Sequence, residues 1–223
     1  RGYQMMGALG GLVSSTAVTL TFARKSREET GSGTALAVGT VAAGTVLVPR
    51  LLGITLVLNP ALLGWAAIGI APMLVAGTFL LLIGHRKLTG GTSPVPSLVL
   101  HNPLQLGSAV KMAAAFQVVL ILLELVSGRY GRIGVLASAA FLGLTDTDAL
   151  AFGMNRLAEA PDMLLTAARA LTLGVVVNSA FKMVLAGMLG SSDYRRLAVP
   201  GLLALTAAAG AGFWLLGWVP LHG

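Results

Sequence analysis

Long apolar segments are the feature of this chain that most limits its fold. An α-helix rises about 1.5 Å per residue, so about 20 apolar residues cross the hydrocarbon core of a bilayer. Seven segments approach or exceed that length, at about residues 5–23, 34–58, 61–84, 108–126, 133–154, 163–189 and 198–219. No stretch alternates polar and apolar residues as a membrane barrel strand would. We therefore predict an all-α, polytopic membrane protein with about seven apolar helices.

The composition and the connections agree with a single membrane domain over residues 1–223. Of the residues, 56% are hydrophobic and 10% are charged, whereas a soluble domain carries about 25% charged residues. Most connections are short. The long one, over residues 87–107, contains Pro94, Pro96 and Pro103, and prolines this dense predict a surface loop rather than a helix.

The chain also resembles itself. Residues 11–24 align with residues 143–156 without a gap. The difference in numbering is constant (143 − 11 = 132), and we call it the repeat offset. The same offset relates Arg50 to Lys182. We predict two structural repeats, the first over about residues 1–86 and the second over about 133–219. The segment at about 108–126 would be a helix that links them.

The basic residues bear on how the two repeats are oriented. If the first and fifth apolar segments cross the bilayer completely, positive charge is divided between the two sides. If both are broken or re-entrant, most basic residues between the spans share one side, which fits the positive-inside rule better. We therefore expect broken or re-entrant helices at residues 11–16 and 143–148, and repeats that are inverted relative to one another.

Asp146 and Asp148 are the costliest residues in the apolar segments. A carboxylate at the centre of a bilayer costs about 2.5–3.5 kcal/mol on insertion scales. On a continuous helix two residues this close point about 200° apart, but both face one cavity if the helix unwinds at residues 143–145. One interpretation is a cation site, with both carboxylates as metal ligands, or a proton relay, assisted by Thr145 and Thr147. The alternative, compatible with the first, is that an Asp caps the following helix.

Polar residues also interrupt the first repeat. Ser14, Ser15 and Thr16 occupy the place equivalent to the acidic motif, where hydroxyls cap a half-helix or bind an ion. The alternative is close helix packing through small residues, which Gly7 and Gly11 favour.

Arg50 and Lys182 are cations at equivalent places in the two repeats, and Asn178 lies one turn before Lys182 on the same helix face. They are charge partners of the aspartates, gates displaced by an ion, or the centre of an anion site. The pattern leaves these roles open, and each cation alone is also able to snorkel to the headgroups.

Several classes of function find no support in the sequence. There is no cysteine, and no P-loop, dinucleotide fingerprint or nucleophile elbow. The three histidines do not cluster with a carboxylate at zinc-ligand spacing. The net charge of +7 lies in short clusters between apolar segments, as in contacts with lipid headgroups rather than nucleic acid. We expect no enzyme, no cofactor and no nucleic-acid partner.

Two motifs resemble a known family. Residues 10–17 with 23–27, and Asn102-Pro103 followed by residues 143–149, are similar to signatures of a bacterial membrane domain, domain of unknown function 4010. Thr147 stands where that pattern usually has a hydrophobic residue. The resemblance implies a multi-pass protein of the bacterial cytoplasmic (inner) membrane, with a further helix and an MgtC/SapB-type domain upstream. It also suggests cation homeostasis.

The sequence therefore favours a transporter or channel for an inorganic cation, with a polar site between the repeats. One alternative is an anion or small-solute transporter that uses Arg50 and Lys182. Another is a regulatory or scaffold protein without transport. Glycine-rich faces on the first and fifth segments also make a homodimer an expectation.

Overall fold

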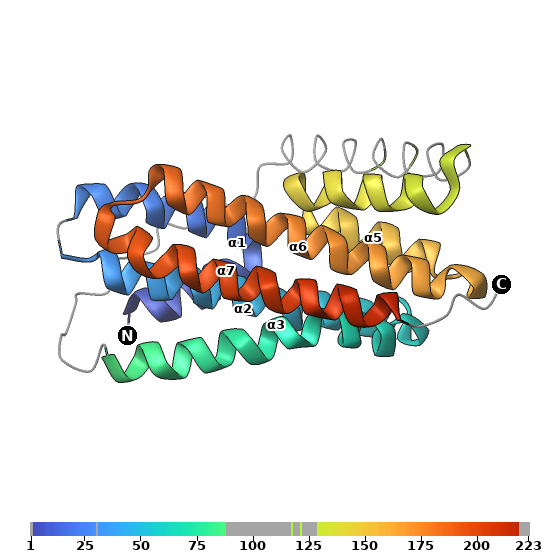
Figure 1. Ribbon diagram of the computed structural model, residues 1–223, viewed down its shortest axis with the longest axis horizontal. Helices are drawn as coiled ribbons and strands as arrows, with labels where there is room; N and C mark the ends of the chain where they lie inside the picture. Colours follow the sequence, from blue (N-terminus) through green and yellow to red (C-terminus); the bar gives the residue numbers. More distant parts are fainter. Residues whose placement is uncertain (1, 30, 88–116, 118–120, 122–128, 219–223) are drawn as a thin grey trace.

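The computed structural model describes residues 2–29, 31–87, 117, 121 and 129–218, and every element in this part of the chain is helical (Figure 1). The elements are α1 (Gly2–Glu28), α2 (Gly33–Leu58), α3 (Pro60–Lys87), a helix over residues 129–145, α5 (Thr147–Leu157), the 3-10 turn η1 (Pro161–Met163), α6 (Leu164–Leu189) and α7 (Ser192–Gly217). Almost all of the predicted loop 87–107 and linking helix 108–126 lies outside the described residues. The chain is a multi-pass helical membrane protein, since five of the described helical segments are long and apolar enough to cross a bilayer.

Helix α1 is long enough to cross a membrane, but it folds back on itself. Ser14 has extended backbone angles, φ −158° and ψ 104°, in the middle of the helix. The Tyr3 hydroxyl donates a hydrogen bond to Glu29 Oε2 at 2.6 Å, 26 residues further along the chain, and the Tyr3 ring packs edge-on against Phe22. On a straight helix residues 3 and 29 would be about 39 Å apart. The element is therefore a helical hairpin, and its break at Ser14 lies within the predicted range 11–16.

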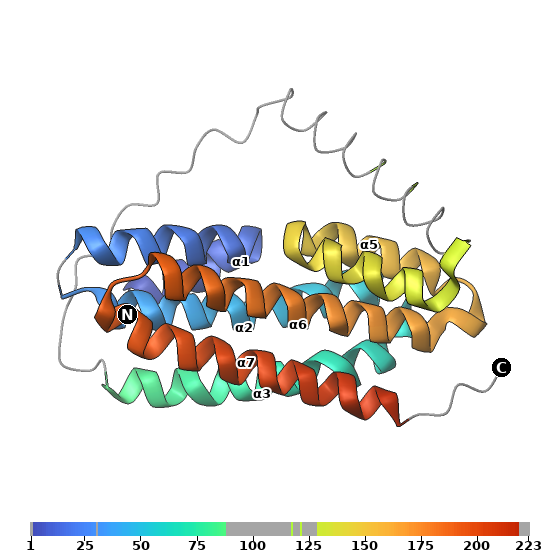
Figure 2. The same cartoon turned by 45° about the horizontal axis from the view of Figure 1, so that its top comes forward.

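The segment 129–157 contains a similar break. Asp146 is extended, with φ −148° and ψ 109°, between the helix over 129–145 and α5. Figure 2 shows α5 running back toward the end from which the preceding helix came. The break lies within the predicted range 143–148. The unwinding predicted at residues 143–145 is wrong, because the helix continues through Thr145 and the single residue Asp146 breaks it. Gly143 stays helical where it packs so closely on α6 that an added Cβ would lie 2.2 Å from Gly174 O.

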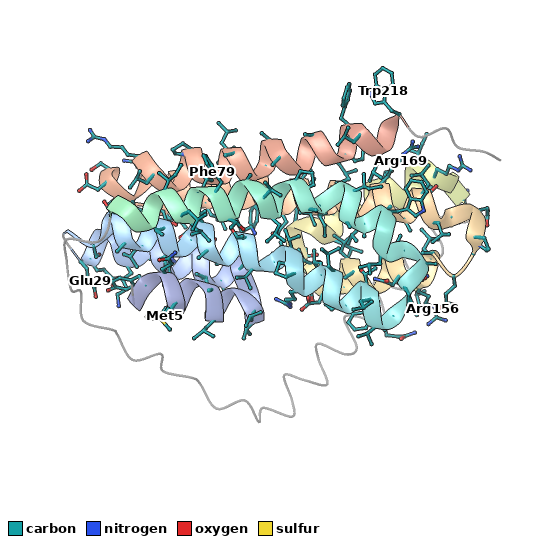
Figure 3. All side chains as sticks on the ribbon, turned by 90° about the horizontal axis from the view of Figure 1, so that it is seen from below. Met5, Glu29, Phe79, Arg156, Arg169 and Trp218 are labelled. Atoms are coloured by element: carbon teal, nitrogen blue, oxygen red, sulfur yellow. The ribbon has the colours of Figure 1, made fainter. Side chains whose placement is uncertain are left out.

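The helices form layers in which the two hairpins occupy one face. In Figure 2, α1 and the hairpin that contains α5 lie end to end, with α2 and α6 next to them and α3 and α7 on the far face. Helix α1 packs on α2 and α5 on α6, while α7 contacts α3 and α6. Glu29 and Arg156, at the outer ends of the two hairpins, lie at opposite ends of the molecule (Figure 3). The two half-helices 2–13 and 147–157, about 18 and 16 Å long, together equal about one hydrocarbon core in length.

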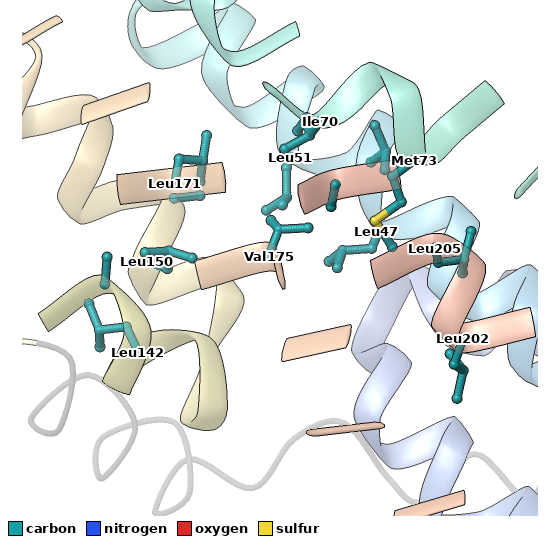
Figure 4. Close-up of a cluster of buried hydrophobic side chains, with 14 of the residues drawn as sticks. Leu47, Leu51, Ile70, Met73, Leu142, Leu150, Leu171, Val175, Leu202 and Leu205 are labelled. Atoms are coloured by element: carbon teal, nitrogen blue, oxygen red, sulfur yellow. The ribbon is translucent and has the colours of Figure 1, made fainter. Parts of the chain in front are cut away.

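Small residues bring the layers close together. An added Cβ at Gly7 would lie 2.0 Å from Gly39 O, and one at Gly11 would lie 2.7 Å from the Ala43 Cα. Gly7 and Gly11 therefore do serve close helix packing, and the helix they pack against is α2 of the same chain. Between the layers, Leu47, Leu51, Ile70, Met73, Leu171 and Val175 belong to one continuous apolar core (Figure 4).

Helix α7 begins six residues before the predicted start at 198. Ser191 caps it, because its Oγ accepts a hydrogen bond from the Tyr194 N–H. The charged residues that follow the cap hid this first turn from the apolar pattern, although Asp193 near a helix N-terminus is electrostatically favourable.

Candidate functional site

A cavity of about 200 Å³ lies where the two helix breaks meet. It is lined by Val13, Ser14, Ser15, Thr16, Arg50, Thr145, Asp146, Thr147, Asp148 and Asn178. Every one of these residues except Val13 is a site residue that the sequence predicted. The tenth predicted residue, Lys182, lies behind the wall and contacts it through Ser15. The fold therefore brings together the polar residues of segments more than 100 positions apart.

Both breaks are built as N-caps. Ser14 Oγ accepts a hydrogen bond from Ala17 N at 3.2 Å. Asp146 Oδ1 accepts from Asp148 N at 2.8 Å and from Ala149 N at 3.3 Å, so the capping interpretation of Asp146 is confirmed. Ser14 and Asp146 are themselves related by the repeat offset. The half-helices over residues 15–28 and 147–157 thus begin at the cavity, and each brings the partial positive charge of its N-terminus.

Arg50 joins the two hairpins. Its Nη1 donates to the carbonyl oxygen of Val13 at 2.9 Å, at the end of the first half-helix. Its Nη2 forms an ion pair and hydrogen bond with Asp148 Oδ2, in the other hairpin. The side chains of Arg50 and Asp148 are 15% and 30% exposed, so the guanidinium binds inside the protein instead of snorkelling. The role of Arg50 as a charge partner of an aspartate is realised in the structure.

Two oxygens at the cavity lack a hydrogen-bond partner in the part of the chain that the structure describes. Asp148 Oδ1 and Asn178 Oδ1 are buried and accept no hydrogen bond from the described residues. The orientation of the Asn178 amide is set by its nitrogen, which donates to Gly143 O at 2.8 Å and to Thr16 Oγ1 at 3.4 Å. Buried acceptors are normally paired, so these two oxygens are free to accept from a ligand, an ion or water.

Lys182 differs from Arg50 in its surroundings. Its side chain is fully buried, and its Nζ lies 3.1 Å from Ser15 Oγ. No described carboxylate forms a salt bridge with it. Among the described residues, the hydrogen bond that joins Lys182 to the first hairpin is the one with the Ser15 hydroxyl.

The ligand set at the cavity consists of oxygen atoms. The hydroxyls of Ser14, Thr16 and Thr147 join the two carboxylates, and Thr145 Oγ1 also bonds back to its own helix at 3.3 Å. Carboxylate, amide and hydroxyl oxygens are the donors preferred by hard cations. Within the described ranges no group of three or more His, Cys, Asp or Glu side chains surrounds a metal position. A site here would rest on Asp146 and Asp148 with neutral oxygens.

The comparisons with known proteins give one match. A family model described as a domain of unknown function, DUF4010, matches residues 1–190. The chain belongs to this family. Neither the curated proteins nor the solved structures contain a match to the chain. The matched region of the DUF4010 domain includes both hairpins and α6, and hence every residue of the cavity.

Two polar features of this DUF4010 domain were missed from the sequence. The Val13 carbonyl is backbone, so no side-chain pattern indicates it, although it directly precedes the first break. Near the end of α5, the Asn155 side chain donates to Thr55 Oγ1 at 3.2 Å, and Asn59 donates to the Asn155 carbonyl at 3.2 Å. An asparagine within an apolar helix is the signal that would have drawn attention to this cluster.

Proposed function

We propose that this DUF4010 domain transports a small inorganic cation and binds it in the cavity between the two helix breaks. One observation carries the proposal: the two breaks meet around Asp148, which has one oxygen held by Arg50 and the other buried without a partner among the described residues. A buried carboxylate that has only one of its two oxygens paired is costly inside a membrane protein. A cation that binds Asp148 Oδ1 and the nearby hydroxyls would offset that cost.

The proposal includes two inverted repeats. It is supported by the offset that relates Ser14 to Asp146 and Arg50 to Lys182, and by hairpins whose outer ends lie at opposite ends of the bundle. In transporters, inverted repeats with discontinuous helices place the ion site near the bilayer midplane, and access alternates as one half moves against the other. Alternating access of this kind would explain why each of the two repeats supplies one helix break to the site.

Arg50 acts in this proposal as a tethered cation. Its guanidinium occupies the place between an unwound carbonyl, Val13 O, and a carboxylate, the two kinds of group that bind transported cations at broken helices. A bound cargo ion would replace the Arg50 guanidinium at one or both of these oxygen groups. When the ion leaves, Arg50 would again bind the Val13 carbonyl oxygen and Asp148.

Anion or small-acid transport is the second candidate function. The observation that favours it is the positive charge around the cavity: two half-helix N-termini, Arg50, and a lysine without a carboxylate partner among the described residues. Helix N-termini and buried cations are the usual binding groups for anions. The unpartnered oxygens of Asp148 and Asn178 weigh against this candidate, because an anion would repel them.

The other expectations are part of the same proposal. We place the protein in the bacterial inner membrane, with an MgtC/SapB-type domain of the same polypeptide upstream, and assign it no catalytic activity. The homodimer also stays a proposal, although Gly7, Gly11 and Gly143 pack against α2 and α6 of the same chain. A scaffold role without transport is the outcome if no flux is found.

Ion flux into proteoliposomes tests the proposal. The purified protein and the Asp148→Asn variant are compared with Li⁺, Na⁺, K⁺, Mg²⁺, Mn²⁺ and Cl⁻ as probe ions. Asp162→Asn is the matched control, because Asp162 is exposed in η1 and does not line the cavity. We expect cation-selective flux that Asp148→Asn abolishes and Asp162→Asn leaves unchanged.

Each other result has a defined meaning. Anion-selective flux would replace the cation proposal with the second candidate. Cation flux that survives in Asp148→Asn would remove Asp148 from the site. Folded protein without any flux would contradict transport by this domain.

A further inference from the structure

The two unpartnered oxygens at the cavity differ in charge. Asp148 Oδ1 and Asn178 Oδ1 are buried and accept no hydrogen bond from the described residues. Asn178 is only 3% exposed and still lines the cavity. One of these oxygens belongs to a carboxylate and the other to a neutral amide. A cation in the cavity is therefore offered one unpaired carboxylate oxygen and one unpaired neutral oxygen, with hydroxyl groups beside them.

The second carboxylate at the cavity is engaged by its own helix. Asp146 Oδ1 accepts hydrogen bonds from Asp148 N at 2.8 Å and from Ala149 N at 3.3 Å. The partial positive charge of the α5 N-terminus balances part of the negative charge of this cap. Asp146 therefore attracts a cation in the cavity less strongly than a carboxylate without such partners would.

The formal charges that line the cavity amount to a single negative charge. The lining contains two carboxylates, Asp146 and Asp148, and one guanidinium, Arg50, so two negative charges meet one positive charge. The positive charge is permanent, because arginine stays protonated at any accessible pH. The two half-helix N-termini add partial positive charge, and so would an ammonium at Lys182, which lies behind the wall. These side chains therefore give the cavity a net charge of −1 at its most negative.

Charge rather than size decides which cations this cavity suits. Its volume of about 200 Å³ leaves room for an inorganic ion together with several water molecules. A monovalent cation brings the net charge of the cavity to zero. A divalent cation leaves an uncompensated positive charge inside a membrane-embedded protein, where an unpaired charge is costly.

We propose that the transported cation is monovalent and that Arg50 is the residue that excludes divalent cations. The inference rests on the proposed function and adds the charge of the cargo to it. Arg50 holds one oxygen of Asp148 and leaves the other for the ion. Its guanidinium also repels a divalent ion twice as strongly as a monovalent ion at the same distance. Without Arg50 the lining would have two negative charges, which match Mg²⁺ or Ca²⁺.

A carboxylate added to the cavity, with Arg50 left in place, is the direct test. Thr147 lines the cavity and is the first residue of α5, where an aspartate suits the positive end of the helix. Thr147→Asp should therefore fold, and it gives the lining two net negative charges. Ser192→Asp is the matched control, because Ser192 is the exposed first residue of α7 and does not line the cavity.

Cation affinity is measured on the full chain in detergent micelles. The protein is titrated with the chloride salts of Li⁺, Na⁺, K⁺, Mg²⁺, Ca²⁺ and Mn²⁺, and choline chloride holds the ionic strength constant. A cation that binds the folded protein raises its thermal unfolding midpoint in a saturable way, and the concentration dependence gives the affinity. Flux of the same ions into proteoliposomes is measured in parallel.

The unmodified protein and Ser192→Asp should bind one of the monovalent cations at least about tenfold more tightly than any of the three divalent cations. Thr147→Asp should raise the ratio of divalent to monovalent affinity by about tenfold or more, because the added charge attracts a divalent ion twice as strongly. Arg50→Gln should shift the ratio in the same direction. Arg50→Lys keeps the positive charge and should preserve the monovalent preference.

The contrary results separate this inference from the proposed function. Tighter binding of a divalent cation by the unmodified protein would overturn the inference and leave cation transport standing. A monovalent preference that persists in both Thr147→Asp and Arg50→Gln would overturn the cavity charge as its cause. If one of these two variants does not fold, the other decides. Absence of binding and flux for every cation would instead contradict the proposed function itself.

Discussion

Replacing Gly143 by alanine tests the close contact between the helix over 129–145 and α6. An added Cβ would lie 2.2 Å from Gly174 O and 2.8 Å from both the carbonyl carbon and the Cα of Gly174. These are backbone atoms, so no side-chain rotation relieves the contact. Real Cβ contacts essentially never fall under 3.0 Å, so the two helices must separate by about 0.8 Å, from 2.2 to 3.0 Å.

The expected cost follows from overpacking. Forcing a methyl group into a close-packed interface costs about 1–3 kcal/mol. Against this, alanine gains about 0.5–1 kcal/mol over glycine within a helix. We expect Gly143→Ala to lower the free energy of unfolding by about 1–2 kcal/mol. The assay is thermal or denaturant unfolding in detergent micelles, followed by far-ultraviolet circular dichroism.

Gly53→Ala is the matched control. Gly53 is an exposed glycine within α2, and an added Cβ there meets nothing within 4 Å. The alanine should therefore raise the stability by up to about 1 kcal/mol through helix propensity alone. The two variants should change stability in opposite directions. If Gly143→Ala is as stable as Gly53→Ala, the helix over 129–145 does not pack on α6 through Gly174, and the reasoning fails.

Three further predictions concern single contacts. Ser14→Ala and Asp146→Ala should each lower the free energy of unfolding by about 1 kcal/mol, because each removes a helix cap. Asp146→Ser keeps a capping oxygen and should recover most of that loss. Unfolding in detergent micelles measures all three variants. The Tyr3 hydroxyl, and less so Lys25, lowers the pKa of Glu29 below its usual 4.5. This contact therefore stabilises the base of the first hairpin above pH 4.5 and is lost as the pH falls through the lowered pKa. Hydrogen exchange of residues 2–10 should rise in that acidic range, and Tyr3→Phe should remove the pH step. Thr40→Val should cost about 1–3 kcal/mol, because it leaves the buried Tyr194 hydroxyl without its 2.8 Å partner; Thr172→Val, whose hydroxyl bonds only to its own helix at Ala168 O, should cost less in the same unfolding assay.

Much of the site was accessible from the sequence because polar residues in apolar helices are rare and costly. Asp146, Asp148, Arg50 and Lys182 stood out for that reason, and the repeat offset paired them with their counterparts. Nine of the predicted residues line one cavity and the tenth bonds to its wall.

Other features required the three-dimensional structure. The sequence placed the second break within residues 143–148 and suggested unwinding at 143–145, whereas the structure has the break at Asp146 alone. Gly143 serves instead as the point of closest approach to α6. A glycine permits both irregular backbone and close packing, and only the neighbouring helix decides between them.

The chain by itself determined that the protein is helical, embedded in a membrane and interrupted by polar residues at two related places. These properties are local, because they follow from the length of apolar segments and from the cost of polar groups in lipid. Which cation finds which counter-charge was decided by the tertiary structure. Arg50 and Lys182 are equivalent along the sequence, yet among the described residues Arg50 pairs with Asp148, whereas Lys182 bonds to the Ser15 hydroxyl. Partners of this kind come from residues about 100 or more positions away, and only the packing of the hairpins against α2 and α6 brings them within hydrogen-bonding distance.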